Sequence, residues 1–169
     1  YPDIYQNKKI VCLYIPDEDL CDAVNIPFIA NRLKVVEQSR SQSTEKSTRD
    51  MAKYPNRFYY DSYMGTDSII IPSVSSERRE YIPMGFLDAK DLVVAPNLAI
   101  YDAQMWLFGL VTSKIHIIWV RAVGGSLETR IRYSSTLCYN TFPFPEISEE
   151  KKKEIEEAAE EVLCVRAEH

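Results

Sequence analysis

Three charged side chains occupy alternate positions in the last third of the chain: Glu128, Arg130 and Arg132. The positions around them are filled by less polar residues, namely Leu127, Thr129, Ile131 and Tyr133. This period of two predicts a half-exposed strand over 127–133, with the charged side chains about 6–7 Å apart on its outer face. An arginine can pair with O6 and N7 of guanine, and a glutamate can accept from the amino group of cytosine. The face could therefore read a G·C pair; a solvated Glu–Arg ion pair is the alternative.

The segment 73–79, Ser-Val-Ser-Ser-Glu-Arg-Arg, combines residue types that bind phosphate. Serine hydroxyls, backbone N–H groups and arginines are common donors to phosphate oxygens. The candidate residues are Ser73, Ser75, Ser76, Arg78 and Arg79. The alternative is a polar turn between two strands.

No group of residues has the pattern of a catalytic or metal site. The chain has two histidines and four scattered cysteines, which are His116, His169, Cys12, Cys21, Cys138 and Cys164. The segment 140–143, Asn-Thr-Phe-Pro, departs from the Asn-Pro-Pro-Tyr motif of adenine methyltransferases, and no glycine-rich cofactor loop precedes it. We therefore expect no catalytic residue and no metal site in this chain. The cysteines are expected to be reduced, buried thiols of a cytoplasmic protein.

The net charge of −5 hides an uneven distribution along the 169 residues. Residues 1–72 carry 9 basic and 10 acidic groups, residues 73–145 carry 7 and 6, and residues 146–169 carry 4 and 9. The middle segment can therefore meet an anion, although the whole chain lacks the basic balance typical of nucleic-acid binders. No apolar run approaches the roughly 20 residues that span a bilayer, so we expect no membrane contact. The start at Tyr1 suggests a piece of a longer protein.

Periodicity and capping residues predict the elements that position these groups. Helices are expected over 20–24, 27–40 and 44–53, the first of them capped by Asp19. Strands are expected over 10–15, 68–71 and 81–86, and residues 92–94 and 98–101 are expected to form one bent strand or two short ones. Two consecutive apolar helices follow over 105–111 and 113–123, ended by Gly124 and Gly125, and a last helix begins after Ser148.

Three long strings carry a resemblance to a known family: residues 71–86, 116–125 and 130–145. Their sequences are Ile-Pro-Ser-Val-Ser-Ser-Glu-Arg-Arg-Glu-Tyr-Ile-Pro-Met-Gly-Phe, His-Ile-Ile-Trp-Val-Arg-Ala-Val-Gly-Gly and Arg-Ile-Arg-Tyr-Ser-Ser-Thr-Leu-Cys-Tyr-Asn-Thr-Phe-Pro-Phe-Pro. Together they resemble the C-terminal part of the MmeI-like type II (IIG/IIL) restriction–modification enzymes. Those enzymes fuse a nuclease, an adenine-N6 methyltransferase and a target recognition domain. The resemblance extends over nearly all of residues 10–168.

The resemblance implies roles for particular residues. Glu128, Arg130 and Arg132 match the positions that contact bases in the major groove. The serine–arginine segment matches a region near the DNA backbone, and the full set of backbone candidates is Ser73, Ser75, Ser76, Arg78, Arg79, Arg121, Tyr133 and Ser134. S-adenosylmethionine and Mg²⁺ are implied for the parent enzyme, and no cofactor for this segment. The implied partners are double-stranded DNA and the methyltransferase domain of the same parent chain.

The predicted fold is α+β, with a twisted, mostly antiparallel sheet flanked by helices. Residues 1–145 would form the target recognition domain, with a helical part at about 16–53 packed on the sheet, and residues 146–169 a C-terminal helical appendage. The predicted function is sequence-specific binding of duplex DNA that aims catalytic domains lying outside this chain. The alternative is a module that braces a methyltransferase domain and contacts DNA only nonspecifically. A free-standing enzyme is disfavoured, because no catalytic constellation is present.

Overall fold

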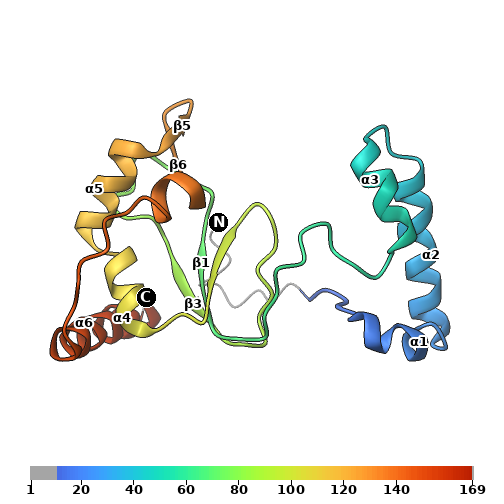
Figure 1. Ribbon diagram of the computed structural model, residues 1–169, viewed down its shortest axis with the longest axis horizontal. Coiled ribbons are helices and arrows are strands. Elements are labelled where there is room, and N and C mark those ends of the chain that lie inside the picture. Colours follow the sequence, from blue (N-terminus) through green and yellow to red (C-terminus); the bar gives the residue numbers. More distant parts are fainter. Residues whose placement is uncertain (1–10, 169) are drawn as a thin grey trace. The chain divides into compact units, whose positions relative to one another are not determined.

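The computed structural model describes residues 11–168, which form two compact units (Figure 1). We call residues 11–62 the helical unit and residues 63–168 the sheet unit. Each unit has its own group of buried hydrophobic residues.

The helical unit consists of short helices around one longer helix. Its elements are η1 (Asp17–Asp19), α1 (Leu20–Ala23), α2 (Pro27–Ser41), α3 (Lys46–Asp50) and η2 (Met51–Lys53). Pro27 stands in the first turn of α2, where its missing N–H costs no hydrogen bond, and the predicted helix over 27–40 is confirmed. Arg40 of α2 donates to the carbonyls of Met51, Tyr54 and Arg57, at 3.2, 2.8 and 2.7 Å. These three hydrogen bonds hold α2 against η2 and against the segment 54–57 that follows it.

Two sequence predictions for the helical unit are wrong. The expected strand over 10–15 is absent from residues 11–15, and residue 10 lies outside the described residues. Ile15 instead packs against Ala23 and Leu33 in the small core, so its apolar character serves helix packing rather than a sheet. Asp19 has helical backbone angles and makes no side-chain capping bond, because η1 runs directly into α1.

The sheet unit contains two antiparallel three-stranded sheets and four helical elements. The strands are β1 (Ser68–Ile71), β2 (Val74–Ser75), β3 (Gly85–Leu87), β4 (Leu98–Tyr101), β5 (Gly125–Leu127) and β6 (Arg130–Arg132). The helical elements are α4 (Met105–Val111), α5 (Lys114–Val123), the π-helical turn η3 (Ser135–Tyr139) and α6 (Glu149–Ala167). The strand orders are β3-β1-β4 and β2-β6-β5. The predicted α+β class is confirmed.

The strands near residues 81–94 are shorter than predicted. Pairing begins only at Gly85, and residues 92–94 form no strand. Pro83 offers no N–H for a strand ladder, which explains why the apolar residues before Gly85 do not pair. Ile82 and Met84 are nevertheless fully buried, because they pack into the core through their side chains.

The core of the sheet unit lies where α4 and α5 meet the β3-β1-β4 sheet. Phe108, Val111 and Val120 are buried with Ile69 and Ile71 of β1. The two helices bend by 54° at the break between them, where the Ser113 side chain accepts from the backbone N–H of His116 and caps α5. Within residues 11–168 no single helix is long and apolar enough to cross a membrane; the bent pair α4–α5 passes that test by length and composition only.

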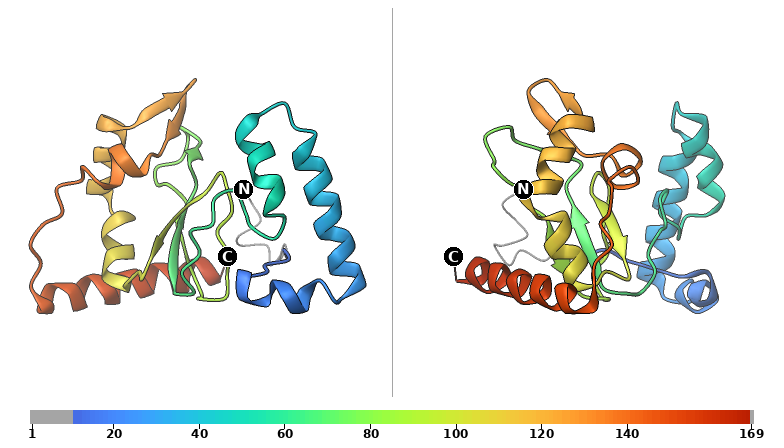
Figure 2. Two further views of the ribbon diagram at one scale, coloured as in Figure 1. Left: turned by 45° about the vertical axis from the view of Figure 1, so that its right-hand side comes forward. Right: turned by 60° about the vertical axis from the view of Figure 1, so that its left-hand side comes forward.

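Helix α6 packs against α4 and belongs to the sheet unit (Figure 2). Ser148 caps it by accepting from the backbone N–H of Lys151 at 3.3 Å, as the sequence predicts. Ala159 is buried, and Arg166 donates to the carbonyl of Met84 at 3.0 Å. Gly109 of α4 faces α6: a Cβ there would lie 2.6 Å from Cγ2 of Ile155 and 3.1 Å from its carbonyl oxygen. The two helices can approach this closely because residue 109 has no side chain.

We predict that Gly109→Leu separates α4 from α6 and lowers the free energy of unfolding by about 1–3 kcal/mol. Gly125→Leu is the matched control, because a Cβ at Gly125 meets no atom within 4 Å, and its effect should stay within about 0.5 kcal/mol. Urea denaturation followed by circular dichroism measures both variants. Equal losses of unfolding free energy in the two variants would show that the close contact between α4 and α6 is not the reason for the effect at residue 109.

Candidate nucleic-acid interface

The charged residues near 130 lie on a β-hairpin, not on one continuous strand. β5 and β6 pair antiparallel, with Leu127 opposite Arg130 and Gly125 opposite Arg132. Glu128 and Thr129 form the two-residue turn between them. The predicted strand over 127–133 is therefore wrong in its first half. Neither turn residue is a usual hairpin-turn residue such as Gly or Asn, so sequence reasoning had no signal for the reversal.

The hairpin changes which side chains face outward. Ile131 is buried, so its neighbours Arg130 and Arg132 point to the opposite, exposed face, as predicted. Residues directly opposite each other in an antiparallel pair share a face, so Leu127 lies on the face of Arg130 and is 45% exposed. The prediction that Leu127 and Thr129 face inward is wrong, because the turn reverses the chain between Leu127 and Ile131.

Glu128 sits at the tip of the hairpin with a left-handed backbone, φ +59°. A non-glycine residue in this region costs about 1–2 kcal/mol. Its carboxylate accepts from Nη2 of Arg130 at 2.7 Å, and both side chains stay accessible, 75% and 47% exposed. Such an exposed ion pair stabilises a fold by at most about 1 kcal/mol. The tip therefore holds a hydrogen-bond acceptor beside a donor, and the interaction between them contributes little to the stability of the fold.

Helix α5 leads directly into the hairpin through Gly124. A Cβ at Gly124 would collide with the carbonyl of Val120 and lie 3.1 Å from the carbonyl of Arg132. Glycine is thus the residue that lets the end of α5 touch β6. In Figures 1 and 2 the hairpin projects at one end of the sheet unit, with α6 at the other end.

The serine–arginine segment lies beside the hairpin, because β2 pairs with β6. Val74 is opposite Arg132 and Ser75 is opposite Ile131. A turn follows β2, in which the hydroxyl of Ser76 accepts from the backbone N–H of Arg78 at 3.3 Å. The structure thus brings the predicted phosphate segment and the predicted base-reading residues onto one small sheet.

Two arginines of this segment are exposed, and a third is tied to it. Arg78 and Arg79 are both exposed. Arg121, on the last turn of α5, donates from Nη2 to the carbonyl of Arg79 at 2.9 Å. Five arginines therefore lie on the hairpin, on the segment that follows its partner strand β2, or on the end of α5, and the same segments carry the acids Glu77, Glu80 and Glu128: Arg78, Arg79, Arg121, Arg130 and Arg132.

Two of the predicted backbone contacts do not fit the structure. Ser75 is 6% exposed and faces the core beside Ile131, and Tyr133 is 3% exposed. The period-two pattern itself placed Tyr133 inward, and the buried side chains of Ser75 and Tyr133 are not available for contact with DNA. Ser73 and Ser134 are half-buried; the Ser73 carbonyl accepts from the N–H of Tyr133 at 2.9 Å.

A buried polar pair lies under the hairpin. Nε2 of His116 and the hydroxyl of Tyr133 are 2.9 Å apart, and the ring of Phe142 stands edge-on to the imidazole at 4.5 Å. His116 is fully buried, and its Nδ1 has no hydrogen-bond partner among the described residues. Burial lowers the pKa of His116 from 6.5 to about 4 and raises the pKa of Tyr133. The imidazole is thus neutral and structural, linking α5 to the end of β6.

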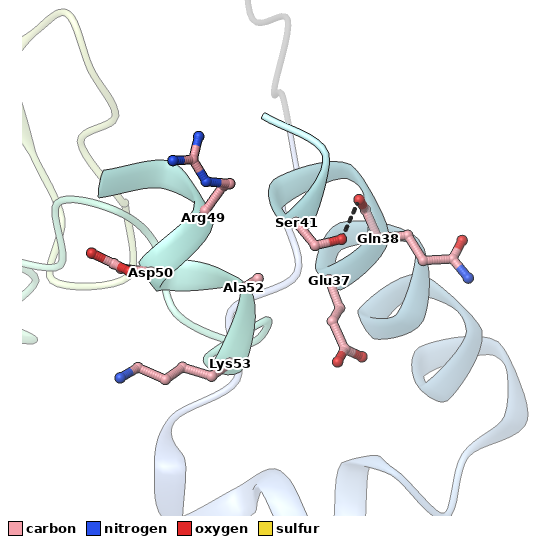
Figure 3. A pocket seen from close by; sticks show the side chains of 7 residues that line it. All are labelled: Glu37, Gln38, Ser41, Arg49, Asp50, Ala52 and Lys53. Carbon is pink, nitrogen blue, oxygen red and sulfur yellow. Dashed lines mark hydrogen bonds between the residues drawn. The ribbon is translucent and has the colours of Figure 1, made fainter. Parts of the chain in front are cut away.

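Two hollows of the surface are lined by described residues outside the hairpin. One lies between α2 and α3 and is lined by charges of both signs (Figure 3). Its residues are Glu37, Gln38, Ser41, Arg49, Asp50, Ala52 and Lys53. Another lies along α6 and includes Gly109 and Ile155. Among residues 11–168, no three His, Cys, Asp or Glu side chains are grouped to hold a metal ion. Only Cys138 is buried, so the expectation of four buried thiols is wrong for Cys12, Cys21 and Cys164.

Comparison with known proteins gives three matches. A model of the family described as "MmeI, target recognition domain" matches residues 2–146. DNA methyltransferase A of Bacillus subtilis (strain 168) is 43% identical over 158 residues, which are 93% of this chain and 18% of that protein. A solved structure of the type IIL restriction-modification enzyme MmeI in complex with DNA aligns with a TM-score of 0.85 and 40% identity, over 94% of this chain and 21% of that one.

The α+β fold, with its exposed hairpin on a small sheet, is that of a target recognition domain. The chain belongs to the MmeI target recognition domain family. The resemblance noted in the sequence is thereby confirmed. The chain spans about a fifth of the length of the two relatives.

The buried imidazole predicts a pH-dependent stability. His116 binds a proton near pH 6.5 in the unfolded chain but only near pH 4 in the folded chain. Between these pH values the unfolded state therefore binds more protons than the folded state. The stabilising effect of the neutral imidazole is complete above pH 6.5 and is lost as the pH falls toward 4. We expect a loss of about 2 kcal/mol between pH 7 and pH 5. Urea denaturation at several pH values measures it.

His116→Gln is the variant that checks the assignment. The variant should be less stable than the wild-type chain at pH 7, yet its free energy of unfolding should change far less between pH 7 and pH 5. The decisive quantity is the change of the unfolding free energy with pH in the variant relative to that in the wild-type chain, rather than the absolute stability. An undiminished slope in the variant would assign the pH dependence to other groups.

Proposed function

We propose that this chain recognises a specific sequence in double-stranded DNA for catalytic domains of a larger parent protein. The observation that carries the proposal is the exposed β5–β6 hairpin, with the Glu128 carboxylate held 2.7 Å from the Arg130 guanidinium. A two-stranded β-ribbon fits the major groove of B-DNA. Placed there, the tip presents one acceptor and one forked donor to the base edges.

The geometry of Glu128 and Arg130 suits contact with the two bases of one G·C pair. The guanidinium of Arg130 can donate to O6 and N7 of guanine, while the carboxylate of Glu128 accepts from N4 of cytosine. Arg132 lies two residues further along β6 on the same face, about 6–7 Å away. This spacing is close to two base-pair steps of about 3.4 Å, so Arg132 would act at a nearby position, about two steps from that pair.

The phosphate contacts are assigned to the arginines beside the hairpin. Arg78 and Arg79 follow β2, and Arg121 holds the carbonyl of Arg79. Ser73, Ser76 and Ser134 are half-buried and border the same sheet. These groups would set the register of the hairpin on the duplex without selecting bases.

The parent protein is inferred from the relatives. They are about five times longer than this chain, and one is described as a DNA methyltransferase and the other as a restriction-modification enzyme bound to DNA. We infer that this chain aims a methyltransferase domain of the same parent, and that S-adenosylmethionine and Mg²⁺ would serve that remaining part. The competing function is a brace with nonspecific DNA contact, which would leave binding indifferent to base sequence.

The phosphate role predicts a change in salt dependence. In the parent protein, Arg78→Ala or Arg79→Ala should weaken binding similarly for all DNA sequences. Each should also reduce the slope of log K against log salt by about one per lost phosphate contact. Fluorescence anisotropy with a labelled duplex at several salt concentrations measures this slope. Lys153→Ala on α6 is the control and should leave the slope unchanged. A changed base preference would instead show that these arginines contact bases rather than phosphates.

The base-reading role predicts a change in specificity. The double change Glu128→Lys and Arg130→Asp exchanges donor and acceptor on an unchanged backbone, so it should favour the reversed base pair at that position. Losing one bidentate contact should cost about 1–3 kcal/mol of discrimination. Selection of bound duplexes from a randomised pool, before and after the change, gives the preferred base at every position.

The matched control exchanges another exposed ion pair. Lys151→Glu with Glu154→Lys reverses a pair of 2.6 Å on α6 and should leave the selected sequence unaltered. If the hairpin exchange also leaves it unaltered while binding persists, Glu128 and Arg130 are only a solvated ion pair.

A further inference from the structure

Leu127 is an apolar side chain on the otherwise polar face of the hairpin. It is directly opposite Arg130 in the β5–β6 pair and shares its face. Among the described residues of the β2-β6-β5 sheet, it is the large hydrophobic residue that is more than a third exposed, at 45%. The core does not require it, because Ile131 fills the inward position of this hairpin.

The position of Leu127 determines what it could contact. Opposed residues in an antiparallel pair have Cβ atoms about 4.5–5.5 Å apart. Successive base pairs in a duplex are about 3.4 Å apart. If Arg130 reaches one base pair, Leu127 therefore reaches the same pair or its immediate neighbour.

The major groove presents one apolar group to a protein, the C5 methyl group of thymine. We propose that Leu127 is a specificity-determining residue that packs against a thymine methyl group beside the base pair read by Glu128 and Arg130. This inference rests on the proposed function and adds to it one further position of the recognised sequence. The contact is apolar on both sides, so its strength comes from the removal of a methyl group and a leucine side chain from water.

The competing explanation is that Leu127 only covers the aliphatic stem of Arg130. Such a contact would stabilise the hairpin equally in every complex, because long charged side chains commonly pack their methylene groups on apolar neighbours. It predicts that changes at residue 127 alter affinity without regard to the bases. The methyl contact predicts an effect confined to one base.

The experiment uses the parent protein and a duplex selected from a randomised pool. Each thymidine of the selected sequence is replaced in turn by deoxyuridine, which lacks only the C5 methyl group. At one position within one step of the G·C pair, wild-type affinity should fall about threefold to fivefold, as expected for one buried methyl group. Leu127→Ala should bind the thymidine and deoxyuridine duplexes equally at that position.

Two further variants make the result specific. Leu127→Met keeps a large apolar side chain and should retain the discrimination. Leu137→Ala, at an exposed leucine of η3 with 48% exposure, should leave it unchanged. Retained selection of the G·C pair by Leu127→Ala would show that the hairpin is still folded.

The outcomes separate this inference from the function on which it rests. If the parent protein selects no sequence, the proposed function fails. If it selects a sequence that has no thymine within one step of the G·C pair, the inference fails while the function stands. The inference also fails if Leu127→Ala keeps the same preference for thymidine over deoxyuridine.

Discussion

The candidate interface depends on the central position of β6 in the β2-β6-β5 sheet. Ile131, in the middle of this three-residue strand, is buried, and its burial forces Arg130 and Arg132 outward. Pairing on one side builds the hairpin with β5, and pairing on the other side brings the serine–arginine segment alongside. One short strand thus places the base-reading and phosphate-binding candidates together, because each pairing fixes a register.

The supports of this strand are buried and its outward groups are loosely held. Gly124 permits close contact of α5 with β6, and the His116–Tyr133 pair joins the same two elements from beneath. Breaking this hydrogen bond would leave two further buried polar atoms unpaired at a cost in free energy, which favours a rigid support. The Glu128–Arg130 pair is exposed and adds little to stability. A rigid support with loosely held outward groups fits the proposed function, in which Glu128 and Arg130 would bind base edges in place of each other.

The separation of support and tip also suits a family whose members act on DNA through much longer chains. Changes at the tip of the hairpin leave the packing of α5, β2 and α6 untouched, since none of the core side chains belongs to the turn. The left-handed backbone of Glu128 is the one strained feature at the tip, and a glutamate there is better explained by its carboxylate than by its backbone preference. In the proposed function, specificity can therefore vary without a change of fold.

Local patterns in the sequence determined much of this protein. Pro27, Ser113, Ser148 and Gly124 mark helix ends through their own backbone and hydrogen-bonding properties, and the family follows from long strings of residues. The tertiary structure alone decided three matters: the turn at Glu128 and Thr129, the burial of Ser75, and the packing of Ile15 between helices. A period of two shows that residues alternate, but not which partner they pair with. The face and the turn depend on distant residues, since burial of Ile131 and pairing with β2 outweigh the weak turn preference of Glu128.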